Sequence, residues 1–398
     1  MLLNTERAGR LMDENGLDGL LATTLTNVFY LSGLWSFTLV VFPQDAQTYA
    51  LASRDKLSLP VLVLYTGEIS KAIVDCPPTT RIINYGAYYR EVAQGAELTA
   101  TEARLKELGV DREPRIDALE GLMRALEETG LTNKTIGLDE KGINPAYPLE
   151  LKKRFPELKI KQAASIFQQI RMVKTEEEIK RLRASVEVTE KALLRAVSVA
   201  RLGVPETEMA NEFQRALIDQ GAEPGPVGPR IGRLTVFGIC PAGNTLLIPG
   251  DRIWFDGGCR YQGYPSDIAR TFAFGDPGER ARRYYKAILE GQQRGLETIK
   301  AGVKAADVFH ATVAAVRAAG IPHFRRHAVG HGIGIDTYDP PLLAPGDETV
   351  LEEGMVLNIE PPYYEIGTGA LAVEDTLVVT KNRPELLTSI SRELEILG

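Results

Sequence analysis

The sequence predicts two domains. The first, over residues 1–165, is an α/β domain with a mixed sheet. The second, over residues 166–398, is an α+β domain with a pseudo-twofold antiparallel sheet. The chain has 398 residues, which exceeds the usual size of a single hydrophobic core. Helix-like and strand-like segments alternate in the first half, whereas long strands joined by turns dominate from Arg230 onward. This change of pattern indicates two different architectures.

The first half of the chain alternates between segments with helical periodicity and short apolar segments typical of strands. Residues 5–14 read as a helix, and residues 116–129 read as a second helix that Gly130 ends. Three short apolar runs between them read as strands: residues 19–22, 38–42 and 61–65. This alternation predicts a three-layer domain around a mixed sheet.

The boundary between the domains falls within residues 159–174. After it, Thr175 followed by Glu178 has the pattern of a capping box, and we expect it to open a helix that runs to about Ala200. A further helix is expected over residues 206–220, where Gly221 ends it.

Two hairpins are expected in the second domain, each with an acidic residue on both arms. Asp256 and Asp267 flank the turn-forming residues 257–258 and 263–265, and Glu360 and Glu374 flank residues 361–362 and 367–369. Two such hairpins fit a pseudo-twofold antiparallel sheet. Helices near residues 278–301 and 305–319 are expected outside it.

The acidic residues of these hairpins, together with one histidine, form a candidate metal site. Four carboxylates and one imidazole are an oxygen-rich set, which suits a pair of Mn, Co or Zn ions better than a thiolate-bound structural zinc. No cluster of Lys or Arg adjoins them in the sequence, so a metal pair would offset the cost of burying their charges. The predicted ligands are Asp256, Asp267, His331, Glu360 and Glu374.

The order of these five ligands resembles that of the pita-bread metallopeptidases. This superfamily contains methionine aminopeptidase, prolidase (Xaa-Pro dipeptidase), aminopeptidase P and the metal-free creatinase. The resemblance runs from about Ile166 to the C-terminus, and residues 170–179 resemble the segment that opens the catalytic domain of prolidase-like members. Residues 26–33 carry a weaker likeness to the creatinase-like N-terminal domain. The chain is most similar to a compact bacterial Xaa-Pro dipeptidase.

The resemblance implies a role for each ligand. Asp256 would chelate one metal ion, Asp267 and Glu374 would bridge both, and His331 and Glu360 would bind the second. Glu360 would also act as the general base, taking a proton from the water that the two ions share, which becomes the attacking hydroxide, and passing it to the leaving nitrogen. The implied reaction is hydrolysis of the Xaa-Pro bond of dipeptides. The implied assembly is a homodimer in which the run that contains Trp35 reaches the neighbouring active site.

Several positions depart from the family pattern. Tyr338 stands where a second active-site histidine is usual, and we expect its phenol to donate a hydrogen bond to a developing oxyanion. Leu342 and Ala372 occupy two usual arginine positions, so the substrate carboxylate needs another partner. The candidates for catalysis or substrate binding outside the ligand set are His327, Tyr338, Arg230, Arg233 and Trp35.

Other functions stay open at this point. A non-peptide amide or ring hydrolase of the creatinase or ectoine-hydrolase kind, an Xaa-Pro aminopeptidase, and a binding protein on an inactive scaffold are the alternatives. The net charge of −7, with acids and bases mixed along the chain, argues against nucleic acid as a partner. No signal peptide or bilayer-spanning run is apparent, and the three cysteines form no CxxC pattern. We therefore expect a cytoplasmic enzyme without a membrane partner.

Overall fold

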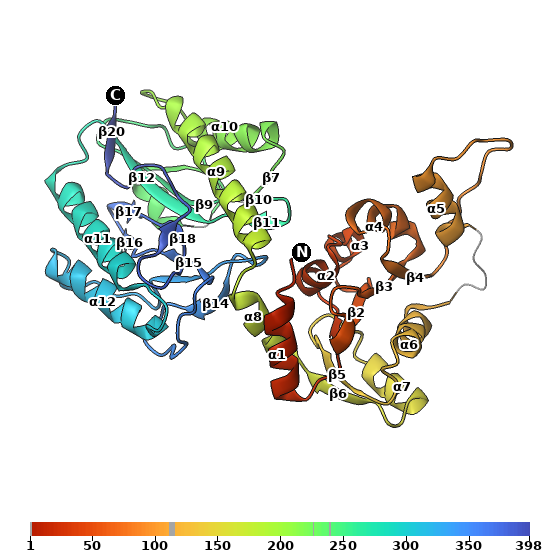
Figure 1. Ribbon diagram of the computed structural model, residues 1–398. Coiled ribbons are helices and arrows are strands. Elements are labelled where there is room, and N and C mark those ends of the chain that lie inside the picture. The colour runs from red at the N-terminus through yellow and green to blue at the C-terminus, as the bar shows by residue number, and fades with distance from the viewer. Residues whose placement is uncertain (1, 111–115, 226, 239) are drawn as a thin grey trace. The chain divides into compact units, whose positions relative to one another are not determined.

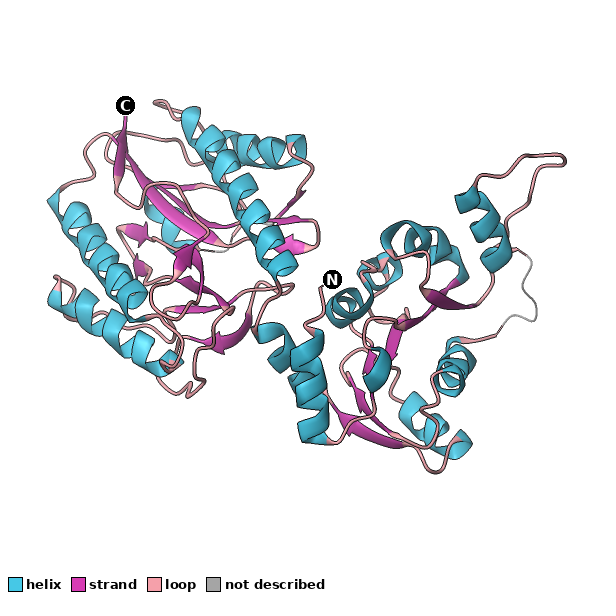
Figure 2. Cartoon of the chain, in the orientation of Figure 1, coloured by secondary structure: helices cyan, strands magenta, loops and turns pink. Residues whose placement is uncertain are grey.

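The chain forms two compact units in the computed structural model, Met1–Arg171 and Met172–Gly398. The structure describes residues 2–110, 116–225, 227–238 and 240–398. Each unit has its own sheets and its own covering helices (Figures 1 and 2). Among the described residues, no helix combines the length and the apolar character that crossing a membrane requires.

The first unit is built on one six-stranded mixed sheet with the strand order β4-β3-β2-β1-β5-β6. Strand β1 pairs antiparallel with β2 and parallel with β5, which confirms the predicted mixed α/β architecture. The strands are β1 (Gly19–Ala22), β2 (Tyr49–Ser53), β3 (Val61–Tyr65), β4 (Arg81–Tyr85), β5 (Thr135–Leu138) and β6 (Lys159–Gln162). The α-helices are α1 (Thr5–Asn15), α2 (Leu25–Ser32), α3 (Phe37–Val41), α4 (Ile69–Asp75), α5 (Ala100–Gly109), α6 (Ala118–Glu128), α7 (Tyr147–Arg154) and α8 (Ala164–Met172).

The core of this unit lies between the sheet and its helices. Helix α6 begins at Asp117, whose side chain accepts a hydrogen bond from the backbone N–H of Glu120. Its buried face carries Leu122 and Leu126, which join Val63 of β3 in one apolar cluster. Burial of this face against the sheet stabilises the helix more than its intrinsic propensity does.

The prediction of a strand over residues 38–42 is wrong, because this segment forms helix α3, Phe37–Val41. The Ser36 hydroxyl caps the helix by accepting from the backbone N–H of Leu39. The buried Glu68 carboxylate accepts from the backbone N–H of Thr38 at 3.2 Å and from its hydroxyl at 2.7 Å. These local acceptors satisfy the first N–H groups of a helix and override the β-propensity of an apolar, β-branched run.

The second unit contains four α-helices among its described residues and several short sheets. Helix α9 begins with the predicted capping box, in which Thr175 and Glu178 each bond to the other's backbone N–H. The helices are α9 (Glu176–Ser198), α10 (Glu206–Asp219), α11 (Glu279–Thr298) and α12 (Ala305–Ala318). The strands are β7 (Glu223–Pro224), β8 (Arg230–Ile231), β9 (Arg252–Gly257), β10 (Cys259–Tyr261), β11 (Tyr264–Pro265), β12 (Ile268–Phe274), β13 (Gly330–Gly332), β14 (Asp339–Leu342), β15 (Val356–Ile359), β16 (Tyr363–Glu365), β17 (Gly369–Leu371), β18 (Asp375–Val378), β19 (Glu385–Leu386) and β20 (Glu395–Leu397).

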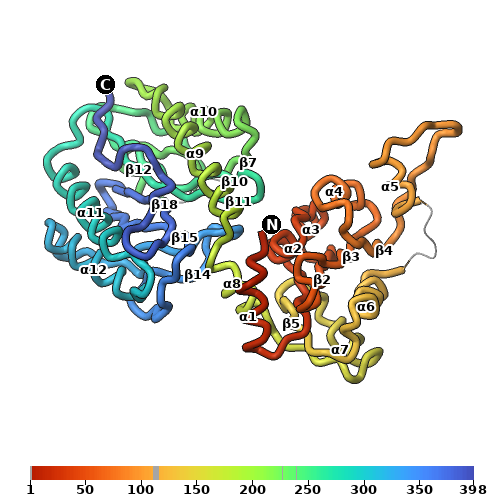
Figure 3. The backbone as a smooth tube through the Cα atoms, viewed as in Figure 1, coloured from red at the N-terminus to blue at the C-terminus, as the bar shows by residue number. Residues whose placement is uncertain are grey.

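Two sheets form the centre of this unit. One has the order β20-β12-β9-β8 and the other β14-β13-β15-β18-β19. A bridge between Ala269 and Glu374 joins them, so β12 and β18 lie side by side although they are distant in sequence (Figure 3). Helices α11 and α12 pack together over the second sheet and bury a large apolar cluster with it, which includes Ile288, Val316 and Leu357.

Candidate metal centre

The two predicted hairpins bring all four acidic residues to strand ends. In the first hairpin β9 pairs antiparallel with β12, so that Asp256 lies opposite Ala269 and Asp267 immediately precedes β12. In the second, β15 pairs antiparallel with β18, with Ile359 opposite Asp375. Glu360 and Glu374 are the next residues outward on these two arms. Each hairpin therefore presents two carboxylates at one end.

A buried arginine connects the hairpins below the carboxylates. The backbone N–H of Glu374 donates to the carbonyl of Ala269 at 2.9 Å. Arg270 donates through Nη1 to the Glu374 carbonyl at 2.5 Å and through Nη2 to Asp375 Oδ1 at 2.7 Å. These bonds fix the position of β12 relative to β18, and with it the positions of the acidic residues on both.

His331 completes the cluster from the neighbouring strand β13, where it lies opposite Asn358 of β15. Its Nε2 atom lies 3.8 Å from Asp267 Oδ2, 4.0 Å from Glu360 Oε1 and 4.0 Å from Glu374 Oε1. One ligand atom from each of Asp267, His331 and Glu374 lies within 4.8 Å of the others. Asp256 is close enough for its charge to raise the pKa of Asp267 and of Glu360.

The free atoms of this cluster fit divalent cations. His331 Nδ1 lies 3.0 Å from the Gly332 carbonyl, which can only accept, so the ring proton lies on Nδ1 and the Nε2 lone pair faces the carboxylates. His331 Nε2 and Glu374 Oε2 are buried without a hydrogen-bond partner in the described structure. The other Glu374 oxygen accepts from Asn358 Nδ2 at 2.8 Å. Orphaned buried acceptors of this kind are costly unless a cation binds them.

The pKa values of the cluster residues also favour binding of cations. Burial raises the pKa of Asp267 and of Glu374 well above the usual range, and the neighbouring carboxylates raise both further. Burial, followed by the charge of Asp256, raises the pKa of Glu360 to about 8. Burial lowers the pKa of His331 to about 4. A neutral imidazole beside crowded carboxylates is the state that binds cations, and bound dications would keep these carboxylates ionised.

Two residues at the cluster were not predicted from the sequence, Arg326 and Tyr364. The charge of Arg326, followed by the Tyr364 hydroxyl, opposes the rise in the pKa of Asp256, and the charge of Arg326 does the same for Glu360. Arg326 Cζ lies 5.3 Å from the centre of the Tyr364 ring. A single arginine therefore lies near carboxylates that no cluster of Lys or Arg adjoins in the sequence. The available signal was the position of Arg326, five residues before His331 in the same run.

Tyr338 lies at the cluster, as expected for a donor near the reacting group. Its ring centroid is 4.0 Å from that of His331, while 65% of the residue remains exposed. Partial burial and the nearby carboxylates raise the pKa of its phenol, which keeps the proton on the oxygen. A cavity of about 480 Å³ opens here, lined by Asp256, Asp267, Tyr338 and others. A small peptide fits a space of this size.

The other candidate residues do not gather at the cluster. Arg230 is buried and pairs with Glu206, its Nε 2.8 Å from Oε1, while its Nη1 donates to the Cys240 carbonyl at 3.0 Å. This structural ion pair corrects its expected substrate role. Arg233 is exposed beside the turn between β16 and β17, near Gly367, and His327 is exposed. In the first unit, Trp35 packs edge-on against Phe29 with ring centroids 5.2 Å apart.

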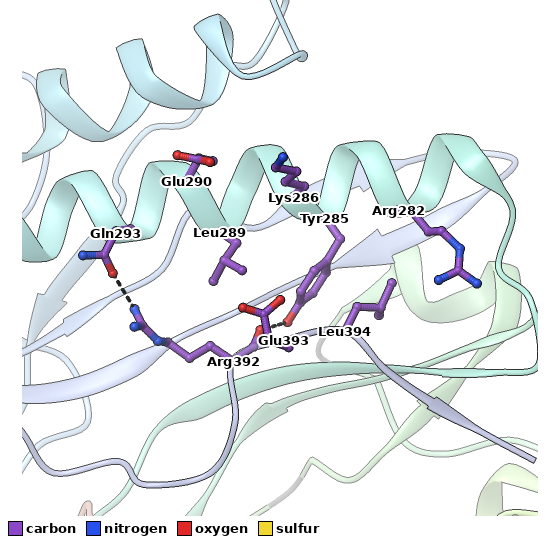
Figure 4. Close-up of a pocket in the computed structure, with 9 residues that line it drawn as sticks. All are labelled: Arg282, Tyr285, Lys286, Leu289, Glu290, Gln293, Arg392, Glu393 and Leu394. Carbon is purple, nitrogen blue, oxygen red and sulfur yellow. Dashed lines mark hydrogen bonds between the residues drawn. The ribbon is translucent and has the colours of Figure 1, made fainter.

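A second hollow, of about 470 Å³, is lined by residues of α11 and by residues 392–394 (Figure 4). The Tyr285 hydroxyl donates to the Arg392 carbonyl there at 2.7 Å, and Arg392 Nη1 donates to Gln293 Oε1 at 3.1 Å. None of its lining residues belongs to the carboxylate cluster. We therefore place the candidate site at the cluster and not in this hollow.

Comparisons with known proteins agree with the geometry. The model of the creatinase/prolidase N-terminal domain matches residues 5–173, and that of metallopeptidase family M24 matches residues 180–381. The chain is 32% identical over 264 residues to an Xaa-Pro dipeptidase of Pyrococcus horikoshii, which covers 65% of this chain and 75% of the relative. It is 26% identical to an uncharacterized peptidase of Bacillus subtilis over 99% of this chain and 100% of that one.

Solved structures show the same fold. The prolidase of Pyrococcus horikoshii superposes with a TM-score of 0.76 at 26% identity, over 98% of this chain and 99% of that one. An Xaa-Pro dipeptidase of Bacillus anthracis gives a TM-score of 0.78 at 24% identity over 99% of both chains. The order of the acidic residues and the histidine, the paired hairpins that hold them and both family matches lead to one assignment: the chain belongs to metallopeptidase family M24.

Proposed function

We propose that this protein is a metal-dependent dipeptidase that hydrolyses the bond between an amino acid and a C-terminal proline. The observation that carries the proposal is the convergence of His331 Nε2 with three carboxylates, with buried atoms that lack any partner in the described structure. The 32% identical relative named an Xaa-Pro dipeptidase supports the substrate class.

We further propose that the ligands are Asp256, Asp267, His331, Glu360 and Glu374, and that they hold two divalent ions per chain, of Mn, Co or Zn. When bound, such ions supply an activated water and polarise the scissile carbonyl. Asp267 and Glu374 lie on different hairpins that the Ala269–Glu374 bridge joins, which suits both to a bridging role. Asp256 would hold one ion, and His331 with Glu360 would hold the other.

Glu360 is suited to the role of general base. Its side chain is 17% exposed, against 1% for Glu374 and 9% for Asp267, so among these three carboxylates it is the most open to water and substrate. It would accept a proton from the attacking water and donate it to the leaving proline nitrogen. Tyr338, which keeps its phenolic proton, would donate a hydrogen bond to the oxygen of the scissile carbonyl.

A substrate panel tests this function. The metal-loaded protein is assayed with Xaa-Pro dipeptides, Xaa-Pro-containing tripeptides, ectoine and creatine, with Mn, Co and Zn supplied separately. We expect cleavage of the dipeptides above all others. Release of the N-terminal residue from tripeptides at higher kcat/KM would make the protein an aminopeptidase, and cleavage of ectoine or creatine alone would overturn the peptidase assignment.

We also propose that the protein acts as a homodimer in which the segment containing Trp35 contacts the partner subunit. The exposed apolar side chains that follow it, Phe37, Val40 and Phe42, support a contact surface there, because each is about half exposed. Light scattering should give twice the chain mass at assay concentration. A stable monomer, or a dimer unaffected by Phe37→Ser with Phe42→Ser, would refute this surface.

A further inference from the structure

Arg326, at the edge of the candidate metal centre, has a guanidinium that forms no hydrogen bond or ion pair with any described residue. It lies between α12 and β13, and it is intermediate in exposure. Its Nε atom is buried without a hydrogen bond, and no carboxylate in the described part of the chain forms an ion pair with it within 4 Å. An arginine in such a position normally pairs with an acid or binds an anion.

The surroundings of Arg326 hold its guanidinium next to the cluster. Its Cζ lies 5.3 Å from the centre of the Tyr364 ring, a distance at which a cation is attracted to the ring face. Tyr364 in turn lies close enough to Asp256 to lower its pKa, and it packs against the apolar cluster that contains Trp254 and Ala372. Tyr364 thus connects the guanidinium to a predicted ligand and limits how far it can move.

The dipeptide of the proposed reaction brings a negative charge close to the metal ligands. A dipeptide has its free carboxylate on the residue next to the scissile bond, and consecutive Cα atoms are about 3.8 Å apart. The cation that binds this carboxylate must therefore lie beside the ligands. Arg230 is paired with Glu206, and Arg233 lies at the turn between β16 and β17.

We propose that Arg326 binds the free C-terminal carboxylate of the dipeptide, with Tyr364 holding the guanidinium in place. It is then the residue that makes the enzyme select dipeptides over longer peptides. This assignment rests on the proposed function. It supplies a carboxylate partner from the loop before β13, in a chain that has Leu342 and Ala372 where arginines are usual.

The test compares Ala-Pro with its C-terminal amide, Ala-Pro-NH2, in the metal-loaded full-length protein. The variants are Arg326→Met, which removes the charge at similar length, and Arg326→Lys, which keeps the charge without the two-pronged geometry. Arg325→Met, at the exposed neighbouring residue, is the matched control. Thermal melting of each variant verifies that it is folded, and Arg326→Lys provides the test if Arg326→Met does not fold.

We expect Arg326→Met to raise KM for Ala-Pro by about ten- to a hundredfold, with little change in kcat. KM for Ala-Pro-NH2 should be nearly unchanged, because the amide has no charge to lose. Arg326→Lys should recover part of the affinity, and Arg325→Met should behave as the parent. An equal rise in KM for both substrates would show that Arg326 only positions Asp256. An unchanged KM for both substrates would also overturn the assignment. If the parent protein cleaves neither substrate, the proposed function itself fails.

Discussion

At the residue scale, Glu360 differs from the other proposed ligands because we also propose it as the general base. It lies 4.0 Å from His331 and is more exposed than Asp267 or Glu374, so it can bind an ion and still exchange a proton with water. Replacement of Glu360 by Gln keeps the shape of the side chain but removes its basicity. We expect kcat to fall by at least about a hundredfold, with melting behaviour close to that of the parent. Turnover near that of the parent would remove Glu360 from the base role.

The proposed ligands could be identified in the sequence because each lies in a short local motif, whereas their neighbours in the fold could not. Asp256 and Glu374 sit beside strand runs with turn residues between the arms, a pattern visible in the sequence. Arg326 and Tyr364 reach the cluster from a loop and from β16, and only the folded sheet brings them together. Arg230 was misread for the opposite reason. Nothing in its local sequence shows that Glu206, on α10, lies close enough to pair with it.

At the scale of elements, the first turn of α9 contains a titrating group. Glu178 accepts from the backbone N–H of Thr175 at 2.9 Å and from the Tyr264 hydroxyl at 3.1 Å. Burial raises the pKa of Glu178 from 4.5 to about 7. Its contribution to stability is therefore fully present below pH 4.5 and is lost as the pH rises through about 7. The difference between the two values corresponds to at most roughly 3 kcal/mol.

Urea unfolding of the parent and of Glu178→Gln at pH 5.5 and pH 8.5 tests whether Glu178 makes stability depend on pH. Gln keeps the capping box but cannot ionise, so the parent should lose stability relative to the variant as the pH rises. The comparison of the two proteins cancels the contribution of the carboxylate cluster, which both retain. If the free energy of unfolding changes equally with pH in the two proteins, the folded protein does not hold a proton on Glu178.

The buried pair of Arg270 and Asp375 is the second element-scale feature, because it connects the two hairpins. Asp375 Oδ1 accepts from Arg270 at 2.7 Å and also from the Thr388 hydroxyl at 2.7 Å. Asp375→Asn leaves the arginine charge buried without an acid. We expect a loss of about 3–5 kcal/mol in the free energy of unfolding of the metal-free protein. Glu348→Gln, which breaks an exposed pair with Lys304, is the control and should cost less than about 1 kcal/mol. An equal loss of stability in the two variants would show that the Arg270–Asp375 pair does not stabilise the fold.

Helix α3 shows where prediction of elements from sequence reaches its limit. Its sequence, Phe37–Val41, is as apolar and β-branched as that of β3, and short runs of this kind do not distinguish the two states. The hydrogen-bond acceptors that favour the helix over a strand are the Ser36 hydroxyl, beside the segment, and the carboxylate of Glu68, which lies far along the chain. The longer helices α9 and α11 were predicted because their apolar periodicity extends over several turns and their ends carry recognisable signals.

At the scale of the whole molecule, the metal centre should contribute to the stability of the second unit. Removing the ions leaves crowded carboxylates whose repulsion the protein must offset by protonation. Ions supplied at a hundred times their Kd stabilise the folded state by about 2.7 kcal/mol, so chelation should lower Tm by about 5–10 °C. Differential scanning calorimetry with and without chelator measures this. A transition unchanged by chelation would argue against ions bound to the folded chain.

The two-part architecture could be predicted at this scale because the change of pattern along the chain is strong. The mixed sheet of the first unit follows from alternating helices and strands. The paired hairpins of the second follow from the repeated arrangement of acidic residues and turns. The bridge from Ala269 to Glu374 that joins the two sheets has no local signal, because it depends on contacts between distant segments.

The most direct test of the central claim is a metal titration of the stripped enzyme. The purified protein is freed of metal, shown to be metal-free by elemental analysis, and reloaded in steps with Mn, Co or Zn while the hydrolysis of an Xaa-Pro dipeptide is followed. The account predicts no activity without metal and a rise that saturates near two ions per chain. Full activity in the metal-free protein, or no hydrolysis with any of the three ions, would contradict it.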